Sequence, residues 1–412
     1  MRTISPPKLP LRQLILPIYF PSALMATGEG IVLLLIPLFA VELGGAVAGA
    51  GTMFALKGIG SVLSDMPTGL AIARFGEKRL MLFGLFLMFV SMLVSSFSQT
   101  LLLLGTGTFG FGVGFGVFML TRLNFIAETT FLHQRGRGMS ILGGIQRIGR
   151  FLGPIIGGVC IKFFGFQITF LIAALIAAIV FVFLLFVLPG AKKRTAKHHF
   201  PKVLALIPRI LAEHKKIFLT AGVAAIALQI TRVGRQLLFP LWGGQIGLDA
   251  AQIGFILGLS SAIDMSLFFL SGIVMDRFGR KWAAVPCIFI LGMSLILLPF
   301  SDSFLSFLLI GLLAGFGNGM GSGIIMTMGA DLSPSTERSE FLGVWRFVGD
   351  LGTVVGPIFI GLLGKLFVLG TASIATGGIG LFGAGIMLFF VRETMIKYEL
   401  NSNSQNEREN PV

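Results

Sequence analysis

The chain has 412 residues, of which 55% are hydrophobic and only 12% are charged; a soluble domain carries roughly 25% charged residues. The net charge of +14 does not indicate nucleic-acid binding, because the basic residues gather in loops between apolar stretches. Cys160 and Cys287 lie in apolar segments, and the four histidines lack metal-ligand spacing. We therefore expect no disulfide framework, no metal site, no cofactor and no nucleic-acid partner.

Apolar stretches long enough to cross a bilayer recur along the whole chain. A spanning helix needs about 20 residues, and Leu80–Phe97 and Ile168–Leu188 have about this length. The stretches lack the alternation of a membrane barrel and are about twice as long as its strands. We predict an all-α integral membrane protein with transmembrane helices at 15–42, 47–73, 80–97, 100–122, 138–162, 166–188, 217–246, 250–275, 282–300, 303–329, 338–364 and 369–391.

The second half of the chain repeats the first at a constant spacing of 203 residues, for example from Gly69 to Gly272. The same spacing maps Gly153-Pro154 onto Gly356-Pro357. Copied halves in a hydrophobic chain are typical of transporters with a substrate site between the halves. We predict two pseudo-symmetric six-helix bundles, at 15–189 and 217–392. The remaining parts are an N-terminal segment 1–14, a basic central loop 190–216 and a polar, disordered tail 393–412.

The placement of lysine and arginine predicts the orientation in the membrane. With the N-terminus inside, the basic loops, including 190–216, all lie on the cytoplasmic side, and the other side keeps only Lys162 and Lys365. Both termini are then cytoplasmic, in a multi-pass protein of the cell membrane. Residues 201–214 of the central loop are compatible with an amphipathic helix on an anionic leaflet. A tether that carries a positive-inside topology signal is the preferred interpretation of this loop.

One loop motif carries a family resemblance. Gly272-x-x-x-Asp276-Arg277-Phe-Gly279-Arg280-Lys281 resembles the loop signature between helices eight and nine of the major facilitator superfamily. The resemblance implies the major facilitator fold, alternating access and a latch between the bundles at this loop. The first copy keeps Gly69, Arg74 and Gly76. It has Ala73 at the position of Asp276 and Glu77 at the position of Arg280. We therefore expect a weaker latch there, in which Asp65 is a candidate substitute.

The fifth span contains a glycine motif, Gly149-x-x-x-Gly153-Pro154-x-x-Gly157-Gly158. It is similar to the helix-five motif of the antiporter branch, which favours efflux over uptake, although helix packing alone explains glycines at this spacing. The first span also resembles that of twelve-helix drug:proton antiporters. The stretch Gly105–Gly112 departs from that pattern, because it lacks the arginine of helix four.

Charged residues inside the spans are the candidate transport and proton-coupling residues, because a charge in the bilayer needs a cavity or a partner. The repeat maps Glu29 onto Arg232 and Arg147 onto Asp350, so that both charges invert. We expect Glu29 to pair with Arg147 or Arg150, and Arg232 with Asp350, either as structural ties or as protonation sites. Lys57 is expected to form a local ion pair with Asp65. The full set of candidates is Glu29, Asp65, Arg147, Arg150, Arg232, Arg235, Asp264, Arg346 and Asp350.

The resemblance and the repeat together predict a monomeric secondary transporter rather than an enzyme. Its expected partners are a small organic or lipophilic substrate, protons and the lipid bilayer. The expected activity is proton-coupled efflux by alternating access. The alternatives are a symporter or facilitator that imports a metabolite and, from another class, a membrane-embedded transferase.

Overall fold

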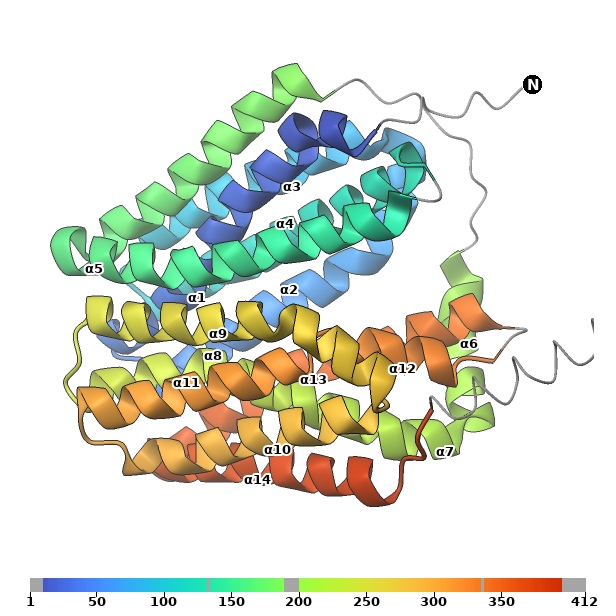
Figure 1. The fold of residues 1–412 in the computed structure, drawn as a ribbon. Helices are drawn as coiled ribbons and strands as arrows, with labels where there is room; N and C mark the ends of the chain where they lie inside the picture. The colour runs from blue at the N-terminus through green and yellow to red at the C-terminus, as the bar shows by residue number, and fades with distance from the viewer. Residues whose placement is uncertain (1–9, 132–133, 189–199, 335–336, 395–412) are drawn as a thin grey trace, which may run out of the picture. The chain divides into compact units, whose positions relative to one another are not determined.

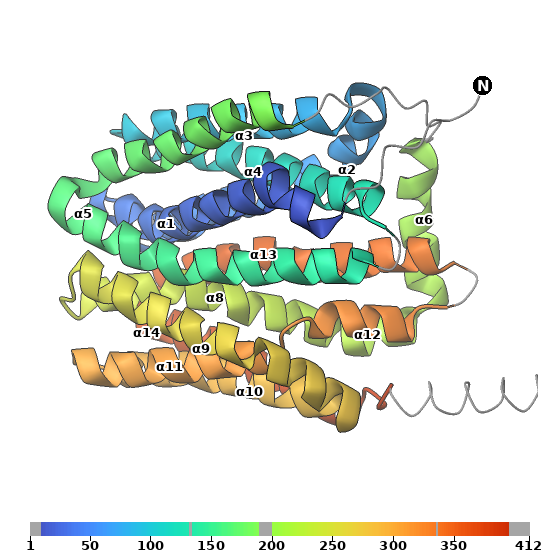
Figure 2. The same cartoon turned by 45° about the horizontal axis from the view of Figure 1, so that its top comes forward.

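A computed structural model describes residues 10–131, 134–188, 200–334 and 337–394, and the elements within them are helices (Figures 1 and 2). Most of the predicted tail and N-terminal segment, and the first part of the central loop, lie outside the described residues. The helices of the first half are α1 (Phe20–Glu42), α2 (Ala46–Phe75), α3 (Glu77–Ser96), α4 (Leu101–Thr129) and α5 (Arg135–Val187). Those of the second half are α6 (Phe200–Glu213), α7 (Lys215–Ile217), α8 (Val223–Gln245), α9 (Ala250–Arg277), α10 (Lys281–Leu297), α11 (Phe304–Met320), α12 (Ile324–Leu332), α13 (Arg338–Leu366) and α14 (Leu369–Phe389). Short helical turns precede α1 and α8 (Leu11–Leu14, Ile15–Tyr19 and Phe218–Gly222) and follow α10 (Leu298–Phe300).

Eleven segments of the described chain are long and apolar enough to cross a membrane. One of them, α5, contains two of the predicted spans, 138–162 and 166–188. Gly165 separates these spans, because its positive φ of 78° interrupts the helix. Glycine tolerates this conformation at no steric cost. The prediction of an all-α membrane fold with twelve spans is therefore confirmed.

The tenth span is broken, which the sequence analysis did not anticipate. It consists of α11 and α12, separated by the turn Gly321-Ser322-Gly323, in which Gly323 has a left-handed φ of 81°. At the repeat spacing these glycines correspond to Phe118 and Leu120, which lie inside the continuous α4. The extra glycines are the local reason why the two copies differ.

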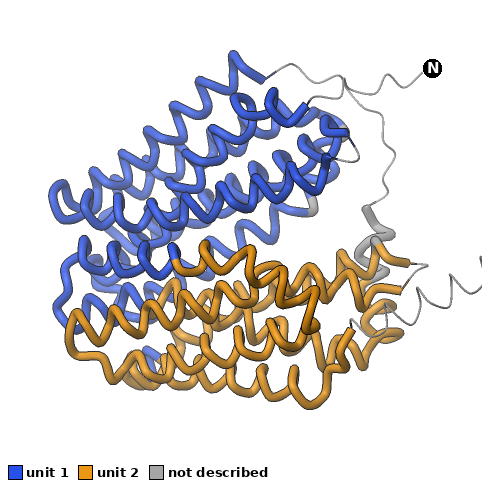
Figure 3. Tube along the Cα trace, viewed as in Figure 1, with its two compact units in different colours: residues 1–198, 239–262, 364–366 blue, residues 199–238, 263–363, 367–412 orange. Residues whose placement is uncertain are grey.

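The chain forms two compact units (Figure 3). Unit 1 comprises Met1–His198, Phe239–Ala262 and Gly364–Leu366, and unit 2 comprises the remaining segments. In unit 1, α1 packs against α5, both α2 and α3 pack against α4, and α3 packs against α5. In unit 2, α10 packs against α14 and α11. The five-part division made from the sequence stays a prediction.

Glycine allows α1 and α5 to touch through their backbones. A Cβ added at Gly153 would lie 2.5 Å from the Gly30 Cα atom, and one at Gly149 would lie 2.4 Å from the carbonyl carbon of Ala26. The second copy repeats this arrangement more loosely, because a Cβ at Gly352 would lie 2.7 Å from the Ile226 oxygen on α8. The helix-five motif is thus a packing face in both copies.

A lysine contact also follows the repeat. Lys78 Nζ donates to the Leu185 carbonyl at 2.8 Å, and Lys281 Nζ donates to the Leu388 carbonyl, also at 2.8 Å. Both residues of the second pair follow their counterparts by 203 positions (78 to 281, 185 to 388). The internal repeat therefore extends to individual hydrogen bonds.

The predicted amphipathic segment 201–214 coincides closely with α6. Arg209 on this helix donates to Glu213 and to Glu337, in each case at 2.8 Å. The hydrogen bond from Arg209 to Glu213 is the main reason that the pKa of Arg209 lies above its ordinary value. The location of α6 on a leaflet stays a prediction.

Candidate functional site

The first helix of unit 1, α1, carries a buried acid. The Glu29 side chain on α1 is 8% exposed, and Lys57 Nζ on α2 lies 3.4 Å from its carboxylate. The charge of Glu29 also acts on Arg122, a residue of α4 that is almost completely buried. One acid and two cations from three helices thus form the unit 1 charge cluster, Glu29, Lys57 and Arg122. Buried charges of this kind mark substrate or proton pathways in membrane proteins.

The partner of Glu29 differs from the expected one. Glu29 pairs with Lys57 and not with Arg147 or Arg150. Lys57 was expected to pair with Asp65, so this second expectation also differs from the structure. Helix geometry explains the difference. Gly30 and Gly149 face each other across the α1–α5 contact, and each residue along a helix turns by about 100°. The neighbouring charged positions therefore point away from that contact.

In unit 2, a chain of hydrogen bonds joins two of the candidate residues through an amide. Arg232 Nε on α8 donates to Asn318 Oδ1 at 3.0 Å, and Asn318 Nδ2 donates to Asp264 Oδ2 on α9 at 2.7 Å. Arg232 also donates to Gln229 at 3.3 Å and to the Gly321 carbonyl at 3.0 Å. The amide of Asn318 thus links the arginine and the buried carboxylate.

Arg232 and Ser271 stabilise the broken tenth span. The break leaves carbonyls without their helical partners, which is costly in a membrane unless other groups bind them. Arg232 donates to the Gly321 carbonyl, and Ser271 Oγ donates to the Met320 carbonyl at 2.6 Å and to the Ser322 carbonyl at 3.4 Å. Irregular backbone of this kind often lies at the substrate site of a transporter.

Gly323→Ala should destabilise unit 2 by about 1–2 kcal/mol, because a side chain is strained in the left-handed conformation. The matched control is Gly378→Ala on α14, where an added Cβ has no atom within 4 Å. Thermal unfolding in detergent measures both variants. Equal midpoints for the two variants would show that the turn does not hold this conformation.

The remaining charged candidates lie apart from these two clusters or make other contacts. Asp350 pairs with Arg346 one turn away on α13 at 3.5 Å, and not with Arg232 as the inverted charges predicted. The reason is that Arg232 is directed to Asn318 and to the helix break. Asp65, Arg147 and Arg235 each make an interaction, and Arg150 is exposed.

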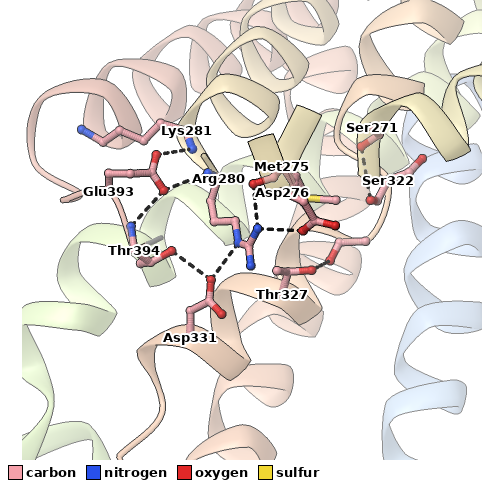
Figure 4. A network of polar contacts seen from close by, with 11 residues as sticks. Ser271, Met275, Asp276, Arg280, Lys281, Ser322, Thr327, Asp331, Glu393 and Thr394 are labelled. Carbon is pink, nitrogen blue, oxygen red and sulfur yellow. Dashed lines mark hydrogen bonds and ion pairs between the residues drawn. The ribbon is translucent and has the colours of Figure 1, made fainter. Parts of the chain in front are cut away.

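The loop between α9 and α10 carries a polar network, which we call the Arg280 network: Asp276, Arg280, Asp331, Glu393 and Thr394 (Figure 4). Arg280 Nε donates to Asp331 at 2.8 Å, and its Nη1 atom donates to Asp276 at 3.1 Å. Thr394 Oγ1 donates to the same Asp331 oxygen at 3.0 Å. Burial lowers the pKa of Arg280, but the hydrogen bond and charge of Asp331 outweigh it and leave the pKa above its ordinary value.

Glu393 caps the start of α10 from the end of the last span. Its carboxylate accepts the backbone N–H groups of Arg280 at 2.8 Å and of Lys281 at 3.0 Å. A carboxylate is stabilised at a helix N-terminus by these free donors and by the helix dipole. Gly279 permits the approach, because its φ is 105° and an added Cβ would lie 2.6 Å from the carboxyl group. The motif Gly272–Lys281 is thus connected to the residues that follow α14.

Asp331→Asn should lower the free energy of unfolding by roughly 1.5–3 kcal/mol, the usual worth of hydrogen bonds to a charged group. Asp276→Asn is the control, since it removes a carboxylate from the same arginine. The Asp276 side chain is 77% exposed, against 16% for Asp331, and its loss should cost less than about 0.5 kcal/mol. Denaturation in detergent compares the two. A larger cost for Asp276→Asn would contradict this assignment.

The first copy of the loop uses different chemistry. Glu77 occupies the position of Arg280 and accepts a hydrogen bond from Asn124 Nδ2 on α4 at 3.1 Å. Arg74 is exposed and lies against the Phe75 ring, 5.3 Å from its centroid. The structure thus contains a neutral amide contact where the second copy has an ion pair. Whether either loop acts as a latch stays a prediction.

The glycines of the helix-five motif also contact the start of α9, within unit 1. Gly158 lies against the Ala250 carbonyl, and Gly254 lies against the Pro154 carbonyl. Beside them, Lys162 Nζ donates to Asp249 at 2.9 Å, and this hydrogen bond holds the pKa of the Asp249 carboxyl below its ordinary value. The motif therefore packs on two helices, α1 and α9.

Sequence reasoning missed several residues of these sites. Arg122, Asn318, Asp331, Glu393 and Thr394 were not among the candidates predicted from the sequence. Two signals were available. Asn318 is a lone amide inside the glycine-rich stretch Gly315–Gly323, and Glu393 is an acid directly after the last apolar span.

Twelve spans in two repeated sets, with charged side chains buried between the helices, define a multi-pass membrane transporter. The sequence pattern of the Major Facilitator Superfamily matches residues 18–234 and 224–409. The chain belongs to this family, which points to transport rather than catalysis.

Two relatives of known name and one solved structure illustrate the similarity. The human chromaffin granule amine transporter is 26% identical over 361 residues, which cover 85% of this chain and 66% of that transporter. The chain thus spans slightly less than two thirds of that relative's length. The quinolone resistance protein NorA of Staphylococcus aureus is 22% identical over 385 residues, covering 90% of this chain and 95% of NorA. A bacterial homolog of the human lysosomal transporter Spinster has the same fold, with a TM-score of 0.78 at 13% identity, covering 94% of this chain and 98% of that one.

Proposed function

We propose that the protein exports a small organic or lipophilic compound in exchange for protons, working by alternating access. The observation that carries this proposal is the buried Glu29, which lies beside Lys57 and within the field of Arg122. Buried carboxylates that pair with cations often belong to proton pathways in membrane proteins. We propose that Glu29 carries the exchanged proton and that Lys57 and Arg122 move relative to Glu29 during the transport cycle.

Asp264 is the corresponding proton candidate in unit 2. It is buried, and Asn318 connects it to Arg232. Protonation of Asp264 would weaken the hydrogen bond from Asn318. This would in turn affect Arg232, which donates to Asn318 and to the Gly321 carbonyl at the break in the tenth span. Asp350 is a weaker candidate, because its partner Arg346 is half exposed and belongs to the same helix.

Two observations favour export. The glycine motif of α5 is similar to that of antiporters, and it contacts both α1 and α9 through backbone atoms. One relative is named for quinolone resistance and another for amine transport. We further propose a monomer in the cell membrane with both termini in the cytoplasm, since the basic residues then lie on the cytoplasmic side.

Inside-out membrane vesicles from cells that produce the protein test the direction of transport. When respiration acidifies their interior, an exporter accumulates substrate inside them. A fluorescent quinolone and a fluorescent amine are suitable probes. Accumulation that collapses when an uncoupler is added supports the proposal. Equilibration of the probe down its own concentration gradient, unchanged by the uncoupler, contradicts it.

An importing symporter or facilitator is the second candidate. The observation that favours it is the stretch Gly105–Gly112, which lacks the helix-four arginine of the drug:proton antiporters. An importer would lose the probe from energised inside-out vesicles and would accumulate it in right-side-out ones. The same vesicle experiment thus separates the two candidates.

A further inference from the structure

We propose that Arg122 and Lys57 bind the carboxylate of a monovalent aromatic organic acid. This inference rests on the proposed function, because it names the substrate class of the transporter. The site lies on one face of α4, formed by Phe115, Phe118, Met119 and Arg122, which occupy positions i, i+3, i+4 and i+7.

Among the described residues, no carboxylate forms a hydrogen bond with Arg122. The residue is only 2% exposed. Its Nη2 atom donates to the Met119 thioether, a weak acceptor, and its Nε atom is buried without an acceptor among the described residues. A buried guanidinium normally binds a carboxylate or phosphate through its fork of N–H groups. An oxyanion is the missing partner.

A second side chain donates to the same sulfur atom. Gln146 Nε2 on α5 donates to the same Met119 sulfur at 3.1 Å. Arg122 and Gln146 thus direct hydrogen-bond donors at one thioether, and Lys57 Nζ lies 5.3 Å from the centroid of the Phe115 ring on the same face of α4. Donors from α2, α4 and α5 therefore lie along one face of α4.

The charge of the cluster selects the class of anion. Two cations and Glu29 leave a buried charge of one positive unit, and a buried charge is costly unless it is paired. A carboxylate neutralises it, whereas a doubly charged phosphate monoester would leave a net negative charge. Phe118, 5.3 Å from the Arg122 guanidinium, and Phe115 offer ring surfaces for the apolar body of the acid.

This site belongs to the first half alone. The repeat spacing maps Phe115, Met119 and Arg122 onto Asn318, Ser322 and Ile325. No cation replaces Arg122 there. A substrate with one carboxylate would therefore bind in one orientation, with its charged end in unit 1.

The test is binding of three matched fluorophores to the full chain in detergent: pyrenebutyrate, its neutral methyl ester and the cationic pyrenebutylamine. We expect pyrenebutyrate to bind most tightly. Arg122→Gln should weaken pyrenebutyrate binding roughly ten- to a hundredfold, the range for a lost hydrogen bond to a charge, with little effect on the ester. Arg122→Lys should recover part of the affinity. Lys365→Gln changes an exposed cation outside the cluster and is the control.

Glu29→Gln keeps the test decisive if Arg122→Gln fails to fold. Removal of the competing carboxylate should tighten pyrenebutyrate binding and weaken pyrenebutylamine binding. Equal affinity for the three probes, or unchanged pyrenebutyrate binding by Arg122→Gln, would overturn the site. Tight pyrenebutyrate binding without proton-driven export would refute the proposed function and leave the site standing. Proton-driven export of pyrenebutylamine alone would support the proposed function and refute the site.

Discussion

Gly153→Ala is expected to destabilise the protein by about 3 kcal/mol, the upper part of the range for overpacking. The added Cβ would lie 2.5 Å from the Gly30 Cα atom and 2.7 Å from the Thr27 carbonyl. Both are backbone atoms, so the clash cannot be relieved by a side-chain rotation. Helices α1 and α5 would have to separate, which would disturb the packing beside Glu29.

The control for this substitution lies on the same helix. Gly143→Ala adds the same methyl group where no atom lies within 4 Å, and it should stabilise α5 by roughly 0.5–1 kcal/mol. Thermal unfolding of the two purified variants measures the difference. Similar midpoints would mean that α1 and α5 do not touch through their backbones.

Glu29→Gln is expected to reduce proton-coupled export to the level of empty liposomes. The amide cannot carry the exchanged proton, and it leaves Lys57 without the carboxylate that lies 3.4 Å from its Nζ atom. Exchange of labelled for unlabelled substrate across the membrane requires no net proton movement. This exchange should persist in Glu29→Gln, and the comparison separates loss of coupling from loss of folding.

Asp350→Asn is the informative companion of Glu29→Gln. Its ion pair with Arg346 lies within one helix and is partly exposed, so its loss should leave most of the coupling intact. The opposite pattern, with coupling lost in Asp350→Asn and kept in Glu29→Gln, would move the proton site to α13.

The fold was predictable from the sequence because it depends on regular features. Apolar length predicts the spans, and the 203-residue spacing relates the halves down to the contacts of Lys78 and Lys281. The break at Gly321–Gly323 was not predicted, since apolar length does not distinguish one helix from two. Its signal was the pair of glycines that replace Phe118 and Leu120 of the first copy.

The partners of the charged residues were harder to predict. The repeat identified Glu29 and Arg232 correctly as residues of the spans, but it contains no information on the direction in which each side chain points. Helical phase beside the α1–α5 contact directs Glu29 to Lys57. Arg232 donates to the amide of Asn318. The prediction of partners considered only charged residues, and an amide carries no charge. The transport roles of all these residues stay predictions.

Substrate-induced proton movement in proteoliposomes tests the central claim most directly. Liposomes that contain the purified protein and an internal pH dye receive substrate on one side, and the initial rate of pH change is recorded. The proposed function predicts proton movement opposite to the substrate in the wild type and in Asp350→Asn, and none in Glu29→Gln. Substrate uptake without a pH change in the wild type, or an unchanged proton flux in Glu29→Gln, would contradict it.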